Sequence, residues 1–379
     1  MNILKFFIRI TLLFLFIMET VMAQSSMTKE ELLERINQQK DNVTLEISYV
    51  EINDFELPVD VIKNIKFENV EWKNIDASNK KFVNVSFEDC QLKNINMRDM
   101  QLENVTFKNC ELNNVVMNDS KINTIVFDHS KIISTDSNVH NSYRKLNAEK
   151  LIFIKSELQN ISFFESKGNF NFESSELSSI AGYGLQKGSS IKISDSKIYN
   201  MNFSDSDLLF VDIKDSHIVE SKINDSSIGK VILEGNTFKR FPIASEEKYG
   251  TISVTKTGEI TVHGTGPVKD TYIADCVTGT DIYLGEMEFE NVKVERCKVK
   301  DLTFSETKGK TMVISHVNTY ELDLEAAEID TLILKDVRIR GKIYMANAKV
   351  KNYQATNVIV DDNVRIKDKG ASFKIETTH

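Results

Sequence analysis

The chain has 379 residues, of which 41% are hydrophobic and 27% charged, with only 15 Gly and 3 Pro. Together with a mean hydropathy of -0.26, these values exclude collagen-like, low-complexity and multi-spanning membrane proteins and indicate a chain that forms a core. The formal net charge is -9, from 47 Lys and Arg against 56 Asp and Glu. Binding of nucleic acid without sequence preference needs a basic surface, so we expect no nucleic-acid partner.

Residues 1–23 are typical of a secretory signal peptide. Lys5 and Arg9 form a basic region, the apolar run Ile10 to Met18 follows it, and Ala23 ends a small-residue cleavage site. A membrane anchor is the alternative, but the run is much shorter than the roughly 20 residues that span a bilayer. We therefore expect cleavage after Ala23 and a secreted or periplasmic protein that does not span the membrane.

A short helix is expected in the N-terminal segment, residues 24–60. Thr28 and Glu31 have the spacing of a capping box, and Leu32, Leu33 and Ile36 fall on one helical face, which predicts a helix over residues 28–41. Its expected role is to cover the end of the structure that follows, and a partner-binding helix is the alternative.

From residue 62 the sequence repeats with a period of five. Neither the 3.6-residue period of a helix nor the two-residue period of a strand produces this spacing. Fourteen of the first fifteen residues in this register are large and apolar, and the register holds Ile62, Phe67, Trp72, Ala77, Phe82, Phe87, Leu92, Met97, Leu102, Phe107, Leu112, Met117, Ile122, Phe127 and Ile132.

Two further registers accompany the first. Two residues before each central position the chain mostly has β-branched or small residues, with Lys80 as the exception. Two residues after it stands Asn or Asp, in an unbroken run from Asn64 to Asp119. Because Asn and Asp tolerate turn geometry, the pattern predicts a bend every five residues and two inward side chains between bends.

These motifs resemble those of the pentapeptide-repeat family, in a divergent form with Asn-rich, Phe-centred repeats. The chain keeps the family's central Leu or Phe but places its Asx after that residue. The resemblance implies an all-β, right-handed quadrilateral β-helix with four five-residue faces per coil, here with a short N-terminal capping helix. The expected core includes Phe67, Trp72, Phe82, Phe87, Leu92, Phe107, Leu112, Phe127, Ile193, Phe203, Ile213 and Leu233.

The repeat is expected in two blocks, residues 61–240 and the more degenerate residues 273–366, followed by a tail over residues 367–379. Interruptions near residues 134–150 and 166–190 are expected to leave the coil as loops. Between the blocks, residues 241–272 contain two alternating segments around Lys256 to Glu259, which are typical of a hairpin-like insertion.

Motifs for chemistry are sparse. The six His residues form no metal-spaced pair, and no nucleotide-binding or nucleophile motif is present. We therefore expect no catalytic residues, no cofactor and no enzymatic activity. An inward Ser column that includes Ser196, Ser206 and Ser216 is expected to bond the backbone rather than to catalyse.

Four carboxylates recur at every second repeat: Asp195, Asp205, Asp215 and Asp225. Because every fourth repeat begins a new coil, Asp195 is expected next to Asp215, and Asp205 next to Asp225, in neighbouring coils. Such pairs are weak candidates for a metal site that binds calcium. Solvated corner residues that bond backbone amides are the preferred interpretation.

Two cysteine pairs have nearly one-coil spacing. Cys90 and Cys110 are four repeats apart in one inward register, and the separation of Cys276 and Cys297 is longer by a single position. An exported protein can form disulfides, but parallel inward side chains fit disulfide geometry poorly. For Cys90 and Cys110 we favour free, stacked and buried thiols, with a disulfide as the alternative.

The resulting hypothesis is an exported, non-enzymatic structural or interaction protein that presents a rigid side wall to an unidentified protein partner. An exposed last coil also allows end-to-end pairing with another copy. One alternative is a carbohydrate-active β-helix enzyme of the polysaccharide-lyase type with a carboxylate-bound cation. The other, suggested by the resemblance to intracellular members of the family, is an inhibitor that mimics DNA, against which export argues.

Overall fold

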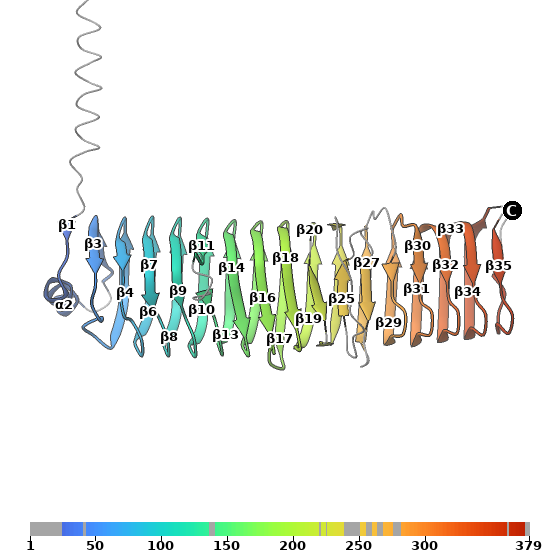
Figure 1. Cartoon of the computed structure of the whole chain (residues 1–379), viewed down its shortest axis with the longest axis horizontal. Helices are drawn as coiled ribbons and strands as arrows, with labels where there is room; N and C mark the ends of the chain where they lie inside the picture. Colours follow the sequence, from blue (N-terminus) through green and yellow to red (C-terminus); the bar gives the residue numbers. More distant parts are fainter. Residues whose placement is uncertain are drawn as a thin grey trace, which may run out of the picture.

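The computed structural model describes residues 25–40, 43–135, 141–219, 221–224, 226–238, 251–254, 260–263, 268–275, 282–361 and 364–375. The expected signal peptide, Asp225 and Cys276 lie outside these residues. The described chain forms an all-β, parallel β-solenoid of about 14 turns with one short helix, which confirms the predicted fold class. The coils stack into a single straight rod (Figure 1). Within the described residues, no helix has the length and apolar character needed to cross a membrane.

The strands are short and mostly eight residues or fewer. In the first half they are β1 (Ser25–Ser26), β2 (Leu45–Ser48), β3 (Val50–Asn53), β4 (Val61–Glu68), β5 (Glu71–Lys73), β6 (Lys81–Glu88), β7 (Gln91–Asn96), β8 (Gln101–Lys108), β9 (Glu111–Val116), β10 (Lys121–Asp128), β11 (Lys131–Ile133), β12 (Asn141–Ser142), β13 (Asn147–Ile154), β14 (Glu157–Phe164), β15 (Lys167–Glu173), β16 (Glu176–Tyr183) and β17 (Ser189–Ser194). In the second half they are β18 (Lys197–Ser204), β19 (Asp207–Lys214), β20 (His217–Val219), β21 (Lys222–Asn224), β22 (Ser227–Ile228), β23 (Lys230–Glu234), β24 (Thr237–Phe238), β25 (Thr251–Val254), β26 (Ile260–His263), β27 (Val268–Ala274), β28 (Ile282–Tyr283), β29 (Glu288–Glu295), β30 (Asp301–Thr303), β31 (Lys308–Ser315), β32 (Asn318–Asp323), β33 (Glu328–Tyr344), β34 (Lys349–Val360) and β35 (Arg365–Lys367).

Each regular coil holds four repeats, and its corners are the Asx residues of the sequence pattern. Phe67 pairs in parallel with Phe87, and Phe87 with Phe107, one coil further on. From Asn64 to Asp119, every Asx of the third register has a positive φ, between 51° and 61°. This left-handed conformation is costly for most residues and least so for Gly, Asn and Asp, which explains why one recurs at each bend.

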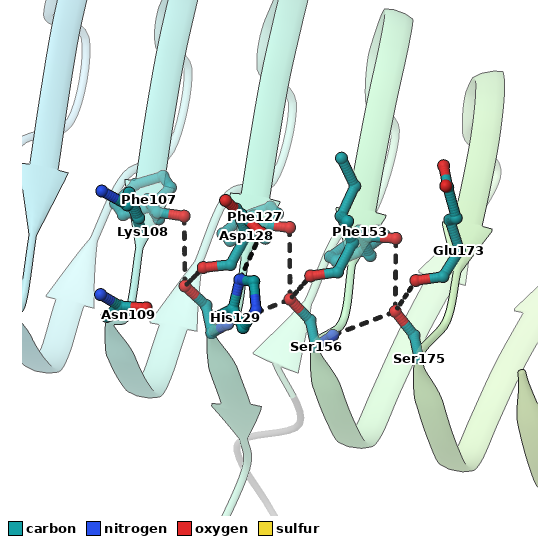
Figure 2. Close-up of polar contacts among 12 residues, drawn as sticks. Phe107, Lys108, Asn109, Phe127, Asp128, His129, Phe153, Ser156, Glu173 and Ser175 are labelled. Carbon is teal, nitrogen blue, oxygen red and sulfur yellow. Dashed lines mark hydrogen bonds and ion pairs between the residues drawn. The ribbon is translucent and has the colours of Figure 1, made fainter.

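The central and second registers fill the bore of the coil. All twelve residues expected in the core have an exposed fraction of 3% or less. Six Phe rings form a continuous stack, here called the Phe ladder, with successive centroids 4.9 to 5.1 Å apart and interplanar angles of 14° or less (part of it in Figure 2). The ladder consists of Phe67, Phe87, Phe107, Phe127, Phe153 and Phe172.

The expected loop over residues 166–190 is wrong. The chain there winds on in the coil as β15 and β16, with register steps of 19 and then 21 residues in place of 20. Two glycines make this winding fit: a Cβ on Gly168 would lie 2.7 Å from the Ala148 carbonyl oxygen, and one on Gly182 would lie 2.1 Å from the Phe203 ring.

The interruption near residues 134–150 is smaller than expected. Phe127 pairs with Phe153, and the hydrogen bond from the Ser130 N–H to Ser156 Oγ likewise spans 26 residues. This coil is therefore longer than the regular 20-residue coil, and the coil is regular again from Asn147.

In the second half, Leu233 pairs with Ile273, two coil lengths further along the chain. Within that segment β25 and β26 pair antiparallel, whereas most strand pairs of the described chain are parallel.

The N-terminal end is covered by α2 (Lys29–Asn37), which begins at the capping box of Thr28 and Glu31. Leu32 on this helix is fully buried against the first coil. The helix ends four residues earlier than the sequence predicted, and the Gln39 side chain donates hydrogen bonds to the carbonyl oxygens of Lys63 and Asn64. These bonds hold Gln39 against β4.

Candidate functional site

The face of the rod over the Phe ladder is a regular outward surface. We call it the ladder wall. It consists of the residues directly before and after each ladder Phe, which point outward because side chains alternate along a strand. Those before the rings are Lys66, Ser86, Thr106, Val126, Ile152 and Asn171, and those after the rings are Glu68, Glu88, Lys108, Asp128, Ile154 and Glu173.

The first three coils of the ladder wall carry a network of ion pairs. The Lys66 ammonium lies 2.9 Å from Glu88 and 3.2 Å from Glu68, and Lys108 lies 2.6 Å from Glu88. Hydrogen bonds from Lys108 and Lys66 lower the pKa of the Glu88 carboxyl. Because each of these side chains is at least a quarter exposed to water, the network contributes little to stability and mainly fixes the pattern of charge on the wall.

An apolar patch follows the charged coils on the ladder wall. Val126 pairs with Ile152, and Asp128 with Ile154, so the three aliphatic side chains lie together on adjacent coils. All three are half-buried although they point away from the core. Lys108 and Glu173 occupy the flanking coils of the same column, which gives the patch a charged rim.

The two corners that border the ladder wall are tied together by side-chain ladders. At one corner Asn104 donates to Asn84, and Asn84 to Asn64, each at 3.1 Å. At the other corner Asn109 donates to Asp89 at 3.1 Å. Each bond links one coil to the next, so the wall is held in a fixed register.

The inward Ser column satisfies the backbone, as the sequence interpretation favoured. Ser175 Oγ lies 3.3 Å from the Phe153 carbonyl oxygen and 2.8 Å from that of Glu173, and it accepts a bond from the Ser156 N–H (Figure 2). The oxygen of Ser156 makes the same contacts one coil earlier. No hydroxyl of this set points to solvent as a nucleophile would, since both serines are buried.

Cys90 and Cys110 occupy earlier positions of the same column. Their Sγ atoms lie 3.4 Å from the carbonyl oxygens of Phe67 and Phe87, where the later coils place a Ser hydroxyl. Both are free, buried thiols. The contact with the Cys90 sulfur and burial raise the pKa of the Cys110 thiol, which makes it a poor nucleophile.

The candidate metal residues lie at corners of the coil. Asp195, Asp205 and Asp215 are exposed and have φ values of 47° to 50°, the geometry of the Asx bends. Asp195 and Asp215 do lie in neighbouring coils, since Lys197 pairs with His217. Among the described residues, no group of three or more metal-ligating side chains is present.

Two charged clusters were not anticipated from the sequence. Lys80, the misfit of the second register, turns its ammonium to Glu56 at 3.2 Å and Asp60 at 3.3 Å. Glu295 is nearly buried on the outside of a later coil and accepts bonds from Tyr272, Lys293 and Arg296. Burial raises the pKa of Glu295, but these three bonds outweigh it and bring the pKa to about 2. Only the isolated Lys80 gave a signal in the sequence, as a charge in an apolar register.

Residues 81–119 match the family description of pentapeptide repeats, with eight copies. These residues form β6 to β9, whose four-repeat register and Asx corners extend along the rod. The repeats in this stretch of the chain are those of the pentapeptide-repeat family, as the sequence pattern predicted. A pentapeptide-repeat β-helix supports the role of a structural or interaction protein. No curated protein is significantly similar to this one in sequence.

Solved structures similar to this pentapeptide-repeat protein include HetL, a pentapeptide repeat protein involved in heterocyst differentiation regulation from the cyanobacterium Nostoc sp. strain PCC 7120. HetL is 10% identical, with a TM-score of 0.24, over 82% of this chain and 94% of HetL. QnrB1, a plasmid-mediated fluoroquinolone resistance protein, is 12% identical over 51% of this chain and 90% of its own, at a TM-score of 0.20. A PL6 alginate lyase is 8% identical over 94% of this chain and 90% of its own, at a TM-score of 0.31. At such TM-scores these likenesses carry no argument about function.

Proposed function

We propose that this pentapeptide-repeat protein is an exported, non-enzymatic interaction protein that binds a protein partner through the ladder wall. The observation that carries the proposal is the apolar patch of Val126, Ile152 and Ile154 on a ladder wall whose other residues are charged or polar. Protein interfaces commonly combine a desolvated apolar centre with a polar rim.

The rigidity of the wall supports this role. The Phe ladder lies directly behind the patch, and the Asn ladders hold the coils that precede the patch in register. A surface that is already ordered loses little conformational entropy when a partner binds. The wall therefore offers a preformed template, and we expect the partner to supply a matching apolar group.

The test is site-specific photo-crosslinking in cells that produce the protein. A photoreactive side chain replaces Ile152 in the patch, and a control places it at Ile333, a half-buried outward residue of β33 at the equivalent position of a later coil. We expect a discrete crosslinked product from position 152 that Ile154→Lys in the same chain removes. Equal crosslinking from both positions would refute the assignment of the wall.

Export is tested separately. We expect the purified native protein to begin at Gln24 and to fractionate with the periplasm or the medium. A protein that keeps residues 1–23 and stays in the cytosol would contradict export and would favour the DNA-mimic alternative. Turnover of polyuronates that depends on Asp215 would instead favour the lyase alternative.

A further inference from the structure

The two ends of the rod carry opposite charge. At the N-terminal end, residues 29–60 of the sequence contain nine acidic and three basic residues, a net charge of -6. At the C-terminal end, residues 349–379 of the sequence contain six basic and four acidic residues, a net charge of +2. The basic end is notable because the whole chain has a net charge of -9.

Exposed apolar side chains also gather at the ends. Nine large hydrophobic residues are exposed among the described residues, and five of them lie in the first two coils or at the last coil. Val43 and Tyr49 are 54% and 48% exposed at the acidic end. Ile359 and Ile366 are 40% and 47% exposed at the basic end. Each end therefore has apolar surface as well as charge to offer a partner.

The C-terminal end is only partly covered by the chain's own tail. The Ser372 N–H donates to the Ala348 carbonyl oxygen at 2.9 Å, and the Phe373 ring packs on Tyr353 with centroids 4.9 Å apart. Ala355 and Val360, which continue the core columns, remain half-buried. The last coil thus keeps part of its interior open, whereas α2 closes the opposite end (Figure 1).

We propose that the basic C-terminal end of one copy docks on the acidic N-terminal end of a second copy. Complementary charge favours this head-to-tail contact, whereas two like ends repel. The contact uses different surfaces on the two copies, so a straight rod adds further copies in line instead of closing into a dimer. One coil end is smaller than a standard protein interface, and we expect micromolar or weaker affinity.

The experiment is sedimentation velocity of the purified protein over a range of concentrations and salt. We expect the average mass to rise past that of a dimer with concentration, and the association to weaken at least tenfold between about 0.05 and 0.5 M salt. Two variants test the ends: a basic-end variant with Arg365→Glu, Lys369→Glu and Lys374→Glu, and an acidic-end variant with Glu30→Lys, Glu34→Lys and Glu46→Lys. All six residues are exposed.

The control carries the same charge change as the basic-end variant in the middle of the rod, at Lys192→Glu, Lys197→Glu and Lys230→Glu, which are also exposed. We expect each end variant alone to lose association at least tenfold, the control to stay within twofold of the parent, and an equimolar mixture of the two end variants to associate again. Monomers at every concentration, a closed dimer, or equal loss in the control would overturn the proposal. We expect ladder-wall variants such as Ile154→Lys to leave this association unchanged, so the two proposals fail independently.

Discussion

Replacement of Phe107 by Ala tests the interior of the coil most directly. The Phe107 ring is fully buried and stacks on Phe87 and Phe127, with both centroid separations 4.9 Å and both interplanar angles 8°. Loss of a buried Phe side chain costs about 3–5 kcal/mol, including the cavity left behind. Each stacking contact adds about 0.5–1.5 kcal/mol, although these contributions overlap. We expect Phe107→Ala to lower the free energy of unfolding by about 4 kcal/mol.

The assay is urea unfolding followed by circular dichroism and by fluorescence of Trp72, the only Trp of the chain. Trp72 is buried, with ring centroids 5.0 Å from Phe67 and 5.3 Å from Phe87, so its emission reports on the coils beside the mutation. Thr106→Ala, one residue away on the ladder wall, is the matched control and should cost less than about 1 kcal/mol. If the two substitutions cost the same, the ring does not lie in the bore and the reasoning fails.

Three further predictions address the corners, an ion cluster and the thiols. Asn94→Ala, at a corner with φ of 57° and two ladder bonds, should destabilise by about 1–2 kcal/mol in the same assay, and Asn94→Gly by less. Equal losses would argue against backbone strain. Because the folded pKa of Glu295 is about 2, below its ordinary 4.5, its stabilisation is complete above pH 4.5 and is lost as the pH falls toward 2. Urea midpoints across pH 2–7 should therefore fall less steeply in this window for Glu295→Gln, and an unchanged slope would contradict the assignment. Cys90 and Cys110 should both react with a thiol reagent in denatured protein without reductant, and no reaction would indicate a disulfide.

The cross-section of the coil follows from the sequence because its geometry imposes the same demand at every fifth residue. A left-handed bend selects Asn or Asp, as at Asn84, and the bore selects a large apolar side chain, as at Phe87. These two requirements act locally and repeat, so a fixed spacing detects them. The spacing also places a bend at His129, where φ is 49° although the residue is neither Asn nor Asp.

Coils that gain or lose a residue are not recognised by a fixed spacing. Such a spacing assigns residues 166–190 to a loop, because one coil there is a residue short and the next a residue long. The coil accommodates these changes in length because Gly182 has no Cβ, which leaves room for the Phe203 ring. Such compensation depends on contacts between coils, and no single repeat contains the information.

The candidate site was less predictable than the core. Outward side chains between the bends obey no register, because water accepts most residue types at those positions. The apolar patch also spans the lengthened coil between Val126 and Ile152, which separates its members by an irregular interval in the sequence. Only the stacked coils show that Val126, Ile152 and Ile154 lie together.

The Phe ladder ends at Phe172, and the same column continues with Ile193, Ile213 and Leu233. In a molecule whose turns touch only their neighbours, resistance to stretching is set turn by turn. Aliphatic turns lack the ring stacking that reinforces the turns before them. Mechanical force applied between the two termini should therefore unfold the C-terminal half first. The half that contains the Phe ladder should unfold last.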